Sequence, residues 1–326
     1  MMPNVDNPLV SILVPVYNVE YYIERCARSV LGQTYPFLEF VFVDDGCTDS
    51  SITVLERVVD EYPSKREHTV IIHHQQNRGL AVARNTALNN CHGDYVLHVD
   101  SDDWIEPNTV ELLINRQTET GADIVYTTGY YCETQETVKC DNHGWCSEKE
   151  SLFVTFLQGN AASCIWGKLI KRRLYTDHGI LCYEQGSYYE GFQTLSRLIY
   201  YSQIISCLDA YLYHYDRLNP NSIVTNVPNS IEIQRQGLLS ILGVCDFFQG
   251  KEQCYYDKVK RFYVSFIYRM LIINCRCRNQ KGYKEFLGLI EKVDRNDWSL
   301  IGWNRPWKRM IDRNYFMKKM FYMSIV

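Results

Sequence analysis

Three aspartates lie close together where a strand is expected to end. Asp100, Asp102 and Asp103 follow an apolar run, residues 95–99, and precede Trp104. Carboxylates this close repel one another and raise each other's pKa, so a fold that keeps them together usually supplies a cation. Carboxylate oxygens are ligands that Mg²⁺ and Mn²⁺ prefer. The cluster therefore predicts a divalent-cation site, and a solvated acidic turn before the next helix is the alternative.

Short apolar runs alternate with helical patterns over residues 9–128, as in βαβ units. Two of the runs, residues 12–14 and 40–43, are apolar on both faces, which is typical of parallel strands covered by helices. We therefore expect an α/β fold with a mostly parallel sheet flanked by helices. The expected strands are residues 10–16, 38–43, 69–73, 95–99 and 124–127, and the expected helices are 20–31, 50–62 and 80–90.

Polar side chains follow three of these strands. Tyr17 and Asn18 follow the first, Asp44 and Asp45 end the second, and the aspartate cluster follows the fourth. Open α/β sheets bind ligands at the carboxyl ends of their strands, so the three segments should face one crevice. The turn after the first strand has no glycine, which argues against a dinucleotide site. An acidic crevice can still hold a diphosphate when a divalent cation bridges carboxylate and phosphate oxygens.

Composition restricts the class of protein. With 46% hydrophobic residues, the 326-residue chain can bury a sizeable core. Its net charge of −4 argues against a nucleic-acid partner. Thirteen scattered cysteines fit free thiols in a reducing cytosol. A secretion signal begins with lysine or arginine, and the first residues of this chain carry neither. No apolar run is long enough to span a bilayer, so a cytoplasmic protein is expected.

The second half changes character. Residues 130–144 are polar and are expected to form an exposed excursion, and the pattern after Ser230 is helical. Residues 303–326 carry six lysines and arginines against one aspartate, with aromatic residues between them. That composition fits either a contact with the anionic inner face of the plasma membrane or a helix packed on the rest of the chain.

Four segments, in this order, resemble the family 2 glycosyltransferases, which have the Rossmann-like GT-A fold. They are residues 10–18, 39–46, 77–85 and 93–103. The resemblance covers residues 9–223. It implies a GT-A domain at 1–229, with a nucleotide-binding half at 1–129 and an acceptor-binding half at 130–229, followed by a helical C-terminal extension at 230–326.

The resemblance implies roles on the nucleotide side of the crevice. Asp45 is expected to accept the hydrogen of a ring nitrogen of the nucleobase, and Tyr17 to pack against the base. Arg84 is expected to donate to the nucleotide. Pro15 and Asp44 belong to the same binding segments.

The resemblance also implies a metal site for Mn²⁺ or Mg²⁺. Asp100 and Asp102 resemble the D-x-D pair of the family, with Asp100 near the ribose and the metal and Asp102 on the metal itself. Ser101 lies between them on the nucleotide side, and Asp103 is expected to support the pair. His214, in an aromatic strand, is a candidate third ligand or a half-buried structural residue.

Three further side chains are expected near the diphosphate or the acceptor. Trp166 could stack on a sugar, although a tryptophan in this position can equally belong to the core. Lys168 lies in the same Trp-x-Lys-Leu segment. Arg217 follows the aromatic strand and is a candidate contact of the diphosphate.

Inverting transfer needs a base on the face opposite the departing diphosphate. Similar proteins place a Glu-Asp pair here, whereas this chain has Glu190 followed by Gly191. A glycine cannot accept a proton, so the base is Glu190, another carboxylate such as Glu184, or absent. Capping of the following helix is the structural alternative for Glu190.

Three functions are compatible with these residues. The leading hypothesis is a metal-dependent inverting glycosyltransferase that uses a nucleotide sugar, with a UDP-sugar favoured, to extend a glycan or a lipid-linked saccharide in surface polysaccharide synthesis. The second is a non-catalytic descendant that binds nucleotide sugars. A nucleotidyltransferase is disfavoured because the glycine-rich phosphate loop is missing after the first strand.

Overall fold

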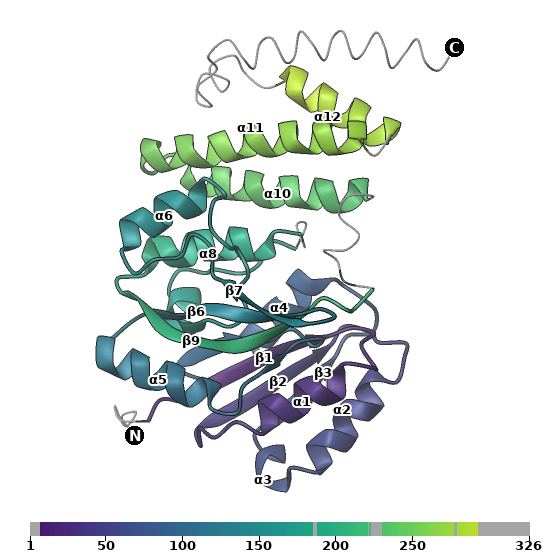
Figure 1. The fold of residues 1–326 in the computed structure, drawn as a ribbon, viewed down its shortest axis with the longest axis vertical. Helices are drawn as coiled ribbons and strands as arrows, with labels where there is room; N and C mark the ends of the chain where they lie inside the picture. The colour runs from purple at the N-terminus through teal and green to yellow at the C-terminus, as the bar shows by residue number, and fades with distance from the viewer. Residues whose placement is uncertain (1–6, 185–187, 221, 223–229, 277–278, 293–326) are drawn as a thin grey trace. The chain divides into compact units, whose positions relative to one another are not determined.

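The computed structural model describes residues 7–184, 188–220, 222, 230–276 and 279–292. By its internal contacts the chain divides into two units, residues 1–244 and 245–326 (Figure 1). The division between residues 229 and 230 that the sequence suggests stays a prediction. Within the described residues, no helix combines the length and the apolar character needed to cross a bilayer.

The described part of the first unit is built on one nine-stranded mixed sheet with the order β3-β2-β1-β4-β8-β6-β9-β5, and β7 pairs with β6. Strands β3, β2, β1 and β4 are parallel, β8 is antiparallel to both neighbours, and β6 and β9 are parallel. The strands are β1 Val10–Val16, β2 Leu38–Asp44, β3 Thr69–His73, β4 Tyr95–His98, β5 Trp104–Ile105, β6 Ile124–Glu133, β7 Thr137–Asp141, β8 Leu169–Lys171 and β9 Ile205–Asp216.

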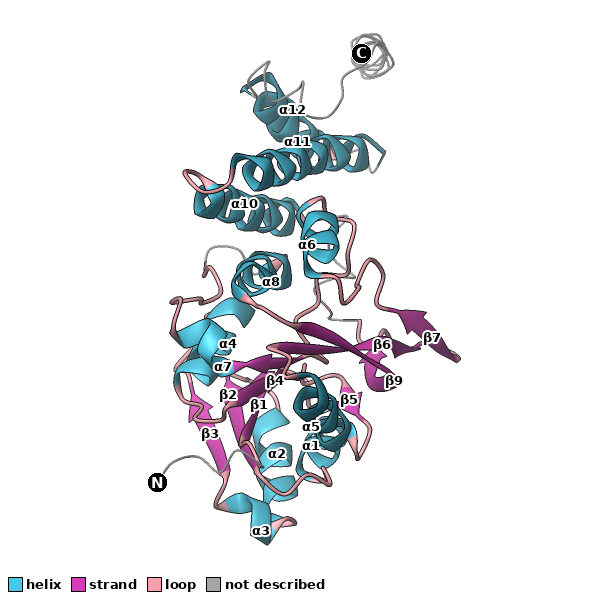
Figure 2. Ribbon diagram, turned by 90° about the vertical axis from the view of Figure 1, so that its left-hand side faces the viewer, coloured by secondary structure: helices cyan, strands magenta, loops and turns pink. Residues whose placement is uncertain are grey.

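Helices cover both faces of the parallel strands. Figure 2 shows α1, α2 and α5 on one side and α4 and α7 on the other. The helices of this unit are α1 Ile23–Leu31, α2 Ser51–Asp60, α3 Pro63–Arg66, α4 Leu80–Asn89, α5 Thr109–Thr120, α6 Lys149–Leu157, α7 Arg172–Thr176 and α8 Glu190–Tyr201. Helix α10, Ile231–Phe248, ends in the second unit, whose described helices are α11 Gln253–Arg276 and α12 Gln280–Lys292.

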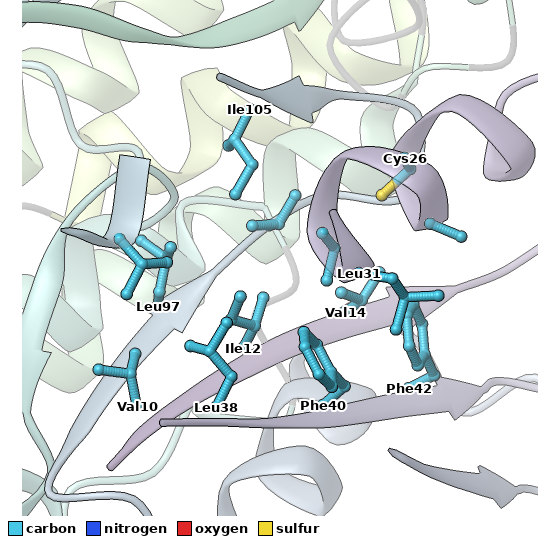
Figure 3. Close-up of a cluster of buried hydrophobic side chains, with 14 of the residues drawn as sticks. Val10, Ile12, Val14, Cys26, Leu31, Leu38, Phe40, Phe42, Leu97 and Ile105 are labelled. Atoms are coloured by element: carbon cyan, nitrogen blue, oxygen red, sulfur yellow. The ribbon is translucent and has the colours of Figure 1, made fainter. Parts of the chain in front are cut away.

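The main core lies between the parallel strands and α1. Alternate residues of β1 and β2 point into it, including Val14 and Phe40, where they meet Cys26 and Leu31 of α1 (Figure 3). Burying an aliphatic or aromatic side chain of this size stabilises a fold by roughly 1.5–3 kcal/mol. Every residue of β1 is buried, as expected for a strand covered on both faces. This packing fixes the carboxyl ends of β1, β2 and β4 at one edge.

The predicted α/β fold is confirmed, and the strands at residues 10–16 and 69–73 have the predicted bounds. The excursion predicted at residues 130–144 is exposed, since residues 134–139 all lie on the surface, but it is a β-hairpin and not a loop. Strand β6 continues to Glu133 and pairs with both β7 and β9, because its alternating aromatic and polar residues suit a half-buried strand. Helix α1 begins three residues later than predicted, since residues 19–22 form a turn closed by a hydrogen bond from the Tyr22 amide to the Val19 carbonyl.

Candidate functional site

The polar residues that follow β1, β2 and β4 lie at one edge of the sheet, as expected. These strands are parallel neighbours, and the register places Val16 beside Asp44 and Leu13 beside His98. The Asp45 amide donates to the Val16 carbonyl over 2.9 Å, which joins the first two strand ends. Tyr17 is 44% exposed at this edge, so its ring is accessible to a ligand.

Asp45 is a buried acceptor that closes the loop after β3. Its Oδ1 lies 2.7 Å from His74 Nδ1 and 3.0 Å from the Arg78 amide, and its Oδ2 accepts from the Gly79 amide at 2.8 Å. A carboxylate offers about four lone-pair positions, so about one remains for an external N–H donor. The nucleobase role predicted for Asp45 fits this geometry and stays a prediction.

Asp44 makes similar hydrogen bonds to the backbone and to a histidine. Its oxygens pair with the Cys47 amide at 2.8 Å and with His73 Nδ1 at 2.9 Å. Burial alone would raise the pKa of Asp44, but these hydrogen bonds outweigh it and lower the pKa below its usual value. Asp44 therefore shapes the turn by contacts within the chain. Pro15, also predicted on the nucleotide side, is buried within β1.

The aspartate cluster lies against the end of β9. Asp103 accepts from the Tyr213 hydroxyl at 2.6 Å and from the Asp216 amide at 2.8 Å, so each of its oxygens already has a partner. Asp102 Oδ2 accepts from Asn219 Nδ2 at 2.8 Å. Asp103 thus supports the turn, while Asp102 retains acceptor capacity.

Basic side chains neutralise only part of the negative charge of the aspartate cluster. Arg84 bonds Asp100 at 2.8 Å, and Arg25 bonds Asp216 at 2.6 Å. Among the described residues, no lysine, arginine or histidine forms an ion pair with Asp102 or Asp103. Burial and then the charge of Asp100 raise the pKa of Asp102 to about 6, and burial raises that of Asp103 well above its usual value.

A divalent cation would relieve this repulsion, and Asp100 and Asp102 offer the hard oxygen atoms that Mg²⁺ and Mn²⁺ prefer. The described part of the chain contains no group of three or more histidine, cysteine or acidic side chains arranged to hold a metal ion. The two carboxylates therefore fit a cation that takes its remaining ligands from phosphate oxygens and water. Ser101, between them, is also buried.

Arg84 is the largest fully buried polar side chain of the site. Its Nη2 bonds Asp100 Oδ1 and lies 3.5 Å from Glu190 Oε1, while Nε and Nη1 have no hydrogen-bond partner. Sequence reasoning placed Arg84 on the nucleotide side. In the structure its guanidinium contacts the carboxylates of Asp100 and Glu190.

Glu190 is the first residue of α8, and its side chain is 16% exposed. Burial raises its pKa above the usual value, and the nearby Arg84 partly opposes that shift. A Cβ added to Gly191 would lie 1.8 Å from the carbonyl oxygen of Ser163. The neighbouring loop thus occupies the space that a side chain at position 191 would need, while exposed Glu184 has no contact of this kind with Arg84.

The three residues predicted at the diphosphate or the acceptor lie in different environments. Trp166 stacks on Tyr213 with ring centroids 4.2 Å apart, which makes it part of the aromatic packing under the cluster. Lys168 is 1% exposed, with Nζ 3.5 Å from Cys164 Sγ, so a direct contact with a diphosphate does not fit its position. Arg217 is exposed next to Asp216.

The geometry does not favour His214 as a metal ligand. Its Nδ1 lies 2.8 Å from Glu133 and its Nε2 2.9 Å from Glu106, so both ring nitrogens are occupied. The ring is stacked between Trp104 and Tyr131 at centroid distances of 4.7 and 4.6 Å. Neighbouring residues of a strand point to opposite faces, so His214 points away from the Tyr213 hydroxyl that meets Asp103.

Four residues that support the cluster were not found from the sequence: Arg25, Tyr213, Asp216 and Asn219. Arg25 also donates to the Asp102 carbonyl at 3.0 Å and lies 3.5 Å above the ring of Trp104. The alternating aromatic residues before Asp216 were the available signal, because every second residue of a strand shares a face. Arg25 carried no such signal.

Comparison with known proteins now identifies the family. The family model described as glycosyl transferase family 2 matches residues 11–178, just over half of the chain. The chain belongs to this family. The resemblance inferred from the four sequence segments is thereby confirmed.

Individual relatives agree with this family. The chain is 38% identical over 180 residues to glycosyltransferase GlyA of Streptococcus pneumoniae; the match covers 51% of this chain and 25% of that protein. This chain therefore spans about a quarter of that relative's length.

Two solved structures share the fold. The S. aureus TarS 1–349 structure in complex with UDP-GlcNAc has a TM-score of 0.58 and 19% identity, covering 85% of this chain and 90% of that one. The mannosyltransferase PcManGT of Pyrobaculum calidifontis, in complex with GDP-Man and Mn²⁺, has a TM-score of 0.55 and 14% identity, covering 93% and 86%. This family 2 glycosyltransferase therefore has the expected GT-A fold.

Proposed function

We propose that this family 2 glycosyltransferase is a metal-dependent inverting enzyme that transfers a sugar from a nucleotide-diphosphate donor, most readily a UDP-sugar, to a glycan or lipid-linked saccharide in surface polysaccharide synthesis. The observation that carries the proposal is the half-buried pair Asp100 and Asp102, next to the buried carboxyl of Asp103, at the edge of the sheet where Tyr17 and Asp45 follow their strands. Such an edge suits a nucleotide whose phosphates arrive with a divalent cation.

Each residue of the proposed site has a role that follows from its position. Asp45 has acceptor capacity for a ring N–H of a base, and the exposed ring of Tyr17 offers a stacking face. Asp100 and Asp102 would hold Mn²⁺ or Mg²⁺, which supplies Lewis-acid stabilisation of the departing diphosphate. Asp103 and Tyr213 hold that turn in place, and exposed Arg217 is the candidate contact for a diphosphate oxygen.

Glu190 is the candidate base. Burial raises the pKa of its carboxyl, which increases the affinity of that carboxyl for a proton, and it lies next to Arg84 at the boundary of the proposed donor site. The base would take the proton of the acceptor hydroxyl while the diphosphate leaves from the opposite face of the sugar.

A specific observation favours a second candidate, a module that binds nucleotide sugars without transferring them. The position that carries an aspartate in similar proteins is Gly191 here, and the Ser163 carbonyl fills the space of its missing side chain. On this view the donor edge is retained and the base is not.

One experiment separates the two candidates. The full chain is incubated with Mn²⁺ and a panel of UDP- and GDP-sugars, with and without saccharide acceptors, and release of nucleoside diphosphate is measured together with donor binding by calorimetry. Release that depends on acceptor supports the transferase. Binding without release supports the module, and absence of both rejects both candidates.

The acceptor side and the location remain part of the proposal. A cytoplasmic site at the inner face of the plasma membrane would match a lipid-linked acceptor. The basic and aromatic segment 303–326, expected to contact that membrane, lies outside the described residues, as do Gly186 and Ile223. Partition of the full chain and of a chain ending at residue 302 onto anionic vesicles tests the contact, because equal partition would remove it.

A further inference from the structure

A short segment is held between the two helices that carry Arg84 and Glu190. This segment, residues 181–183, is named the strap. Asn85 of α4 accepts from the Cys182 amide at 2.7 Å and donates to the Cys182 carbonyl at 2.9 Å. One side-chain amide thus satisfies both backbone groups of one residue, as a neighbouring strand would.

Helix α8 repeats this pairing from the other side. Gln193 accepts from the Tyr183 amide at 2.9 Å and has Nε2 3.4 Å from the Tyr183 carbonyl. Arg197, one turn further along α8, donates to the Leu181 carbonyl at 2.6 Å and lies 4.2 Å from the ring of Tyr183. Each residue of the strap is therefore bonded to a side chain of α4 or α8.

The contacts on both helices lie next to site residues. Asn85 directly follows Arg84, and Gln193 comes three residues after Glu190, so the two lie on neighbouring positions of one face of α8. Asn85 and Gln193 are 6% and 0% exposed. If either side chain is removed, water therefore does not replace its hydrogen bonds to the strap. A shift of either helix against the strap would change the separation of 3.5 Å between Arg84 Nη2 and Glu190 Oε1.

We infer that Asn85 and Gln193 are positioning residues, which fix α4 and α8 to the strap and thereby set Arg84 against Glu190. The inference rests on the proposed function for its effect on turnover. Neither amide touches the strand ends that hold Tyr17, Asp45 or Asp102 in place. Loss of either should therefore slow the chemical step far more than it weakens donor binding.

The test uses the full chain with Asn85→Ala, Gln193→Ala and, as a matched control, Asn142→Ala. Asn142 is also a buried amide, 8% exposed, and it donates to the Thr127 carbonyl at 2.7 Å away from the strap. With the most active donor of the panel, we expect either strap variant to lower kcat about tenfold or more, because small misplacements of reacting groups are costly. The KM for the donor should stay within about twofold.

Combining Asn85→Ala with Glu190→Gln distinguishes a positioning role from a merely structural one. If Asn85 acts through Glu190, Asn85→Ala causes no further loss of kcat in the Glu190→Gln background. Additive losses, or a fall in kcat of the same size in Asn142→Ala, overturn the inference. Two strap variants are used because they act from different helices, so one that fails to fold still leaves the other.

If the wild-type chain turns over no donor, the proposed transferase activity is rejected, but the positioning role of Asn85 and Gln193 can still be tested. Amide hydrogen exchange then provides the test. Both strap variants should then speed exchange at Cys182 and Tyr183 and in the first turn of α8, residues 190–193. Unchanged exchange in that first turn overturns the inference. The Asn142→Ala variant should leave both segments as protected as in the wild-type chain.

Discussion

Arg84 and Glu190 meet inside the protein, with Arg84 Nη2 3.5 Å from Glu190 Oε1. The same nitrogen bonds Asp100 at 2.8 Å, so one guanidinium contacts a carboxylate of the proposed metal pair and the carboxylate beside Gly191. Both acids lose much of their hydration here, and Arg84 itself is 2% exposed. This arrangement couples the donor edge to the start of α8.

Removal of the Arg84 charge should destabilise the fold strongly. Arg84→Met leaves Asp100 and Glu190 without their cation, and breaking a buried ion pair in this way lowers the free energy of unfolding by about 3–5 kcal/mol. Urea denaturation measures the change. Arg28→Met is the control, since Arg28 bonds Glu24 and Glu61 on the surface, where such pairs contribute about 1 kcal/mol or less. Equal losses in the two variants would contradict the prediction.

Position 191 should not accept a side chain. Gly191→Ala places a Cβ 1.8 Å from the Ser163 carbonyl oxygen, and we expect it to lower the free energy of unfolding by about 1–3 kcal/mol through overpacking. Gly191→Asp should do so as well and should not increase diphosphate release. Gly288 of α12 is the matched helical control, because an added Cβ there meets nothing within 4 Å and alanine should stabilise the helix slightly. Thermal unfolding that leaves Gly191→Ala unchanged would refute this account.

The hydroxyl of Tyr213 should matter for metal binding at the proposed Asp100–Asp102 pair. It donates to Asp103 and accepts from the Asp100 amide at 3.1 Å, while its ring stacks on Trp166. Tyr213→Phe keeps the stacking but leaves these polar groups unpaired, which costs about 1–3 kcal/mol.

We expect Tyr213→Phe to bind Mn²⁺ with UDP more weakly than the wild-type chain does, as measured by calorimetry. Tyr175→Phe is the control, because it removes another buried hydroxyl, 3.2 Å from His98 Nε2. A variant at Tyr213 that binds Mn²⁺ with UDP as tightly as the wild type would exclude a role for this hydroxyl in shaping the turn.

Asp102 should carry most of the metal dependence of donor binding. Asp102→Asn keeps an acceptor oxygen but removes the charge that holds a divalent cation. The gain in UDP affinity on adding Mn²⁺ should therefore disappear, whereas metal-free UDP binding should persist. Asp209→Asn, on the exposed side of β9, should preserve the gain. If Mn²⁺ still strengthens UDP binding to Asp102→Asn, the metal lies elsewhere.

Local patterns predicted the parallel half of the fold well. The β1 and β2 runs are apolar on both faces and the chain between them has a helical period, so their place in a covered sheet follows from the order of residues alone. The polar ends of these strands then predicted correctly that the side chains after β1, β2 and β4 share one edge of the sheet. The continuation of β6 past Gly129 was missed, because its partners in β9 are about 80 residues away and local pattern does not encode that pairing.

Distant partners also explain why the surroundings of several predicted site residues could not be read from the sequence. Lys168 and Arg84 are long charged residues, which are usually exposed, yet the fold buries both. His214 lies in an aromatic strand that could face either side, and its pairing with Trp104 on β5 and Tyr131 on β6 fixes its direction. Ser163 precedes Gly191 by 28 residues, and their contact depends on how that loop meets α8.

That contact also constrains the order in which this lineage can change. With the Ser163 carbonyl in place, a single codon change that introduces an acid at Gly191 meets an immediate steric penalty. The loop at residues 161–165 must move first, and that step alone introduces no acid. The glycine is therefore hard to replace by one substitution at a time, and an acid at position 191 requires paired changes in the loop and in α8.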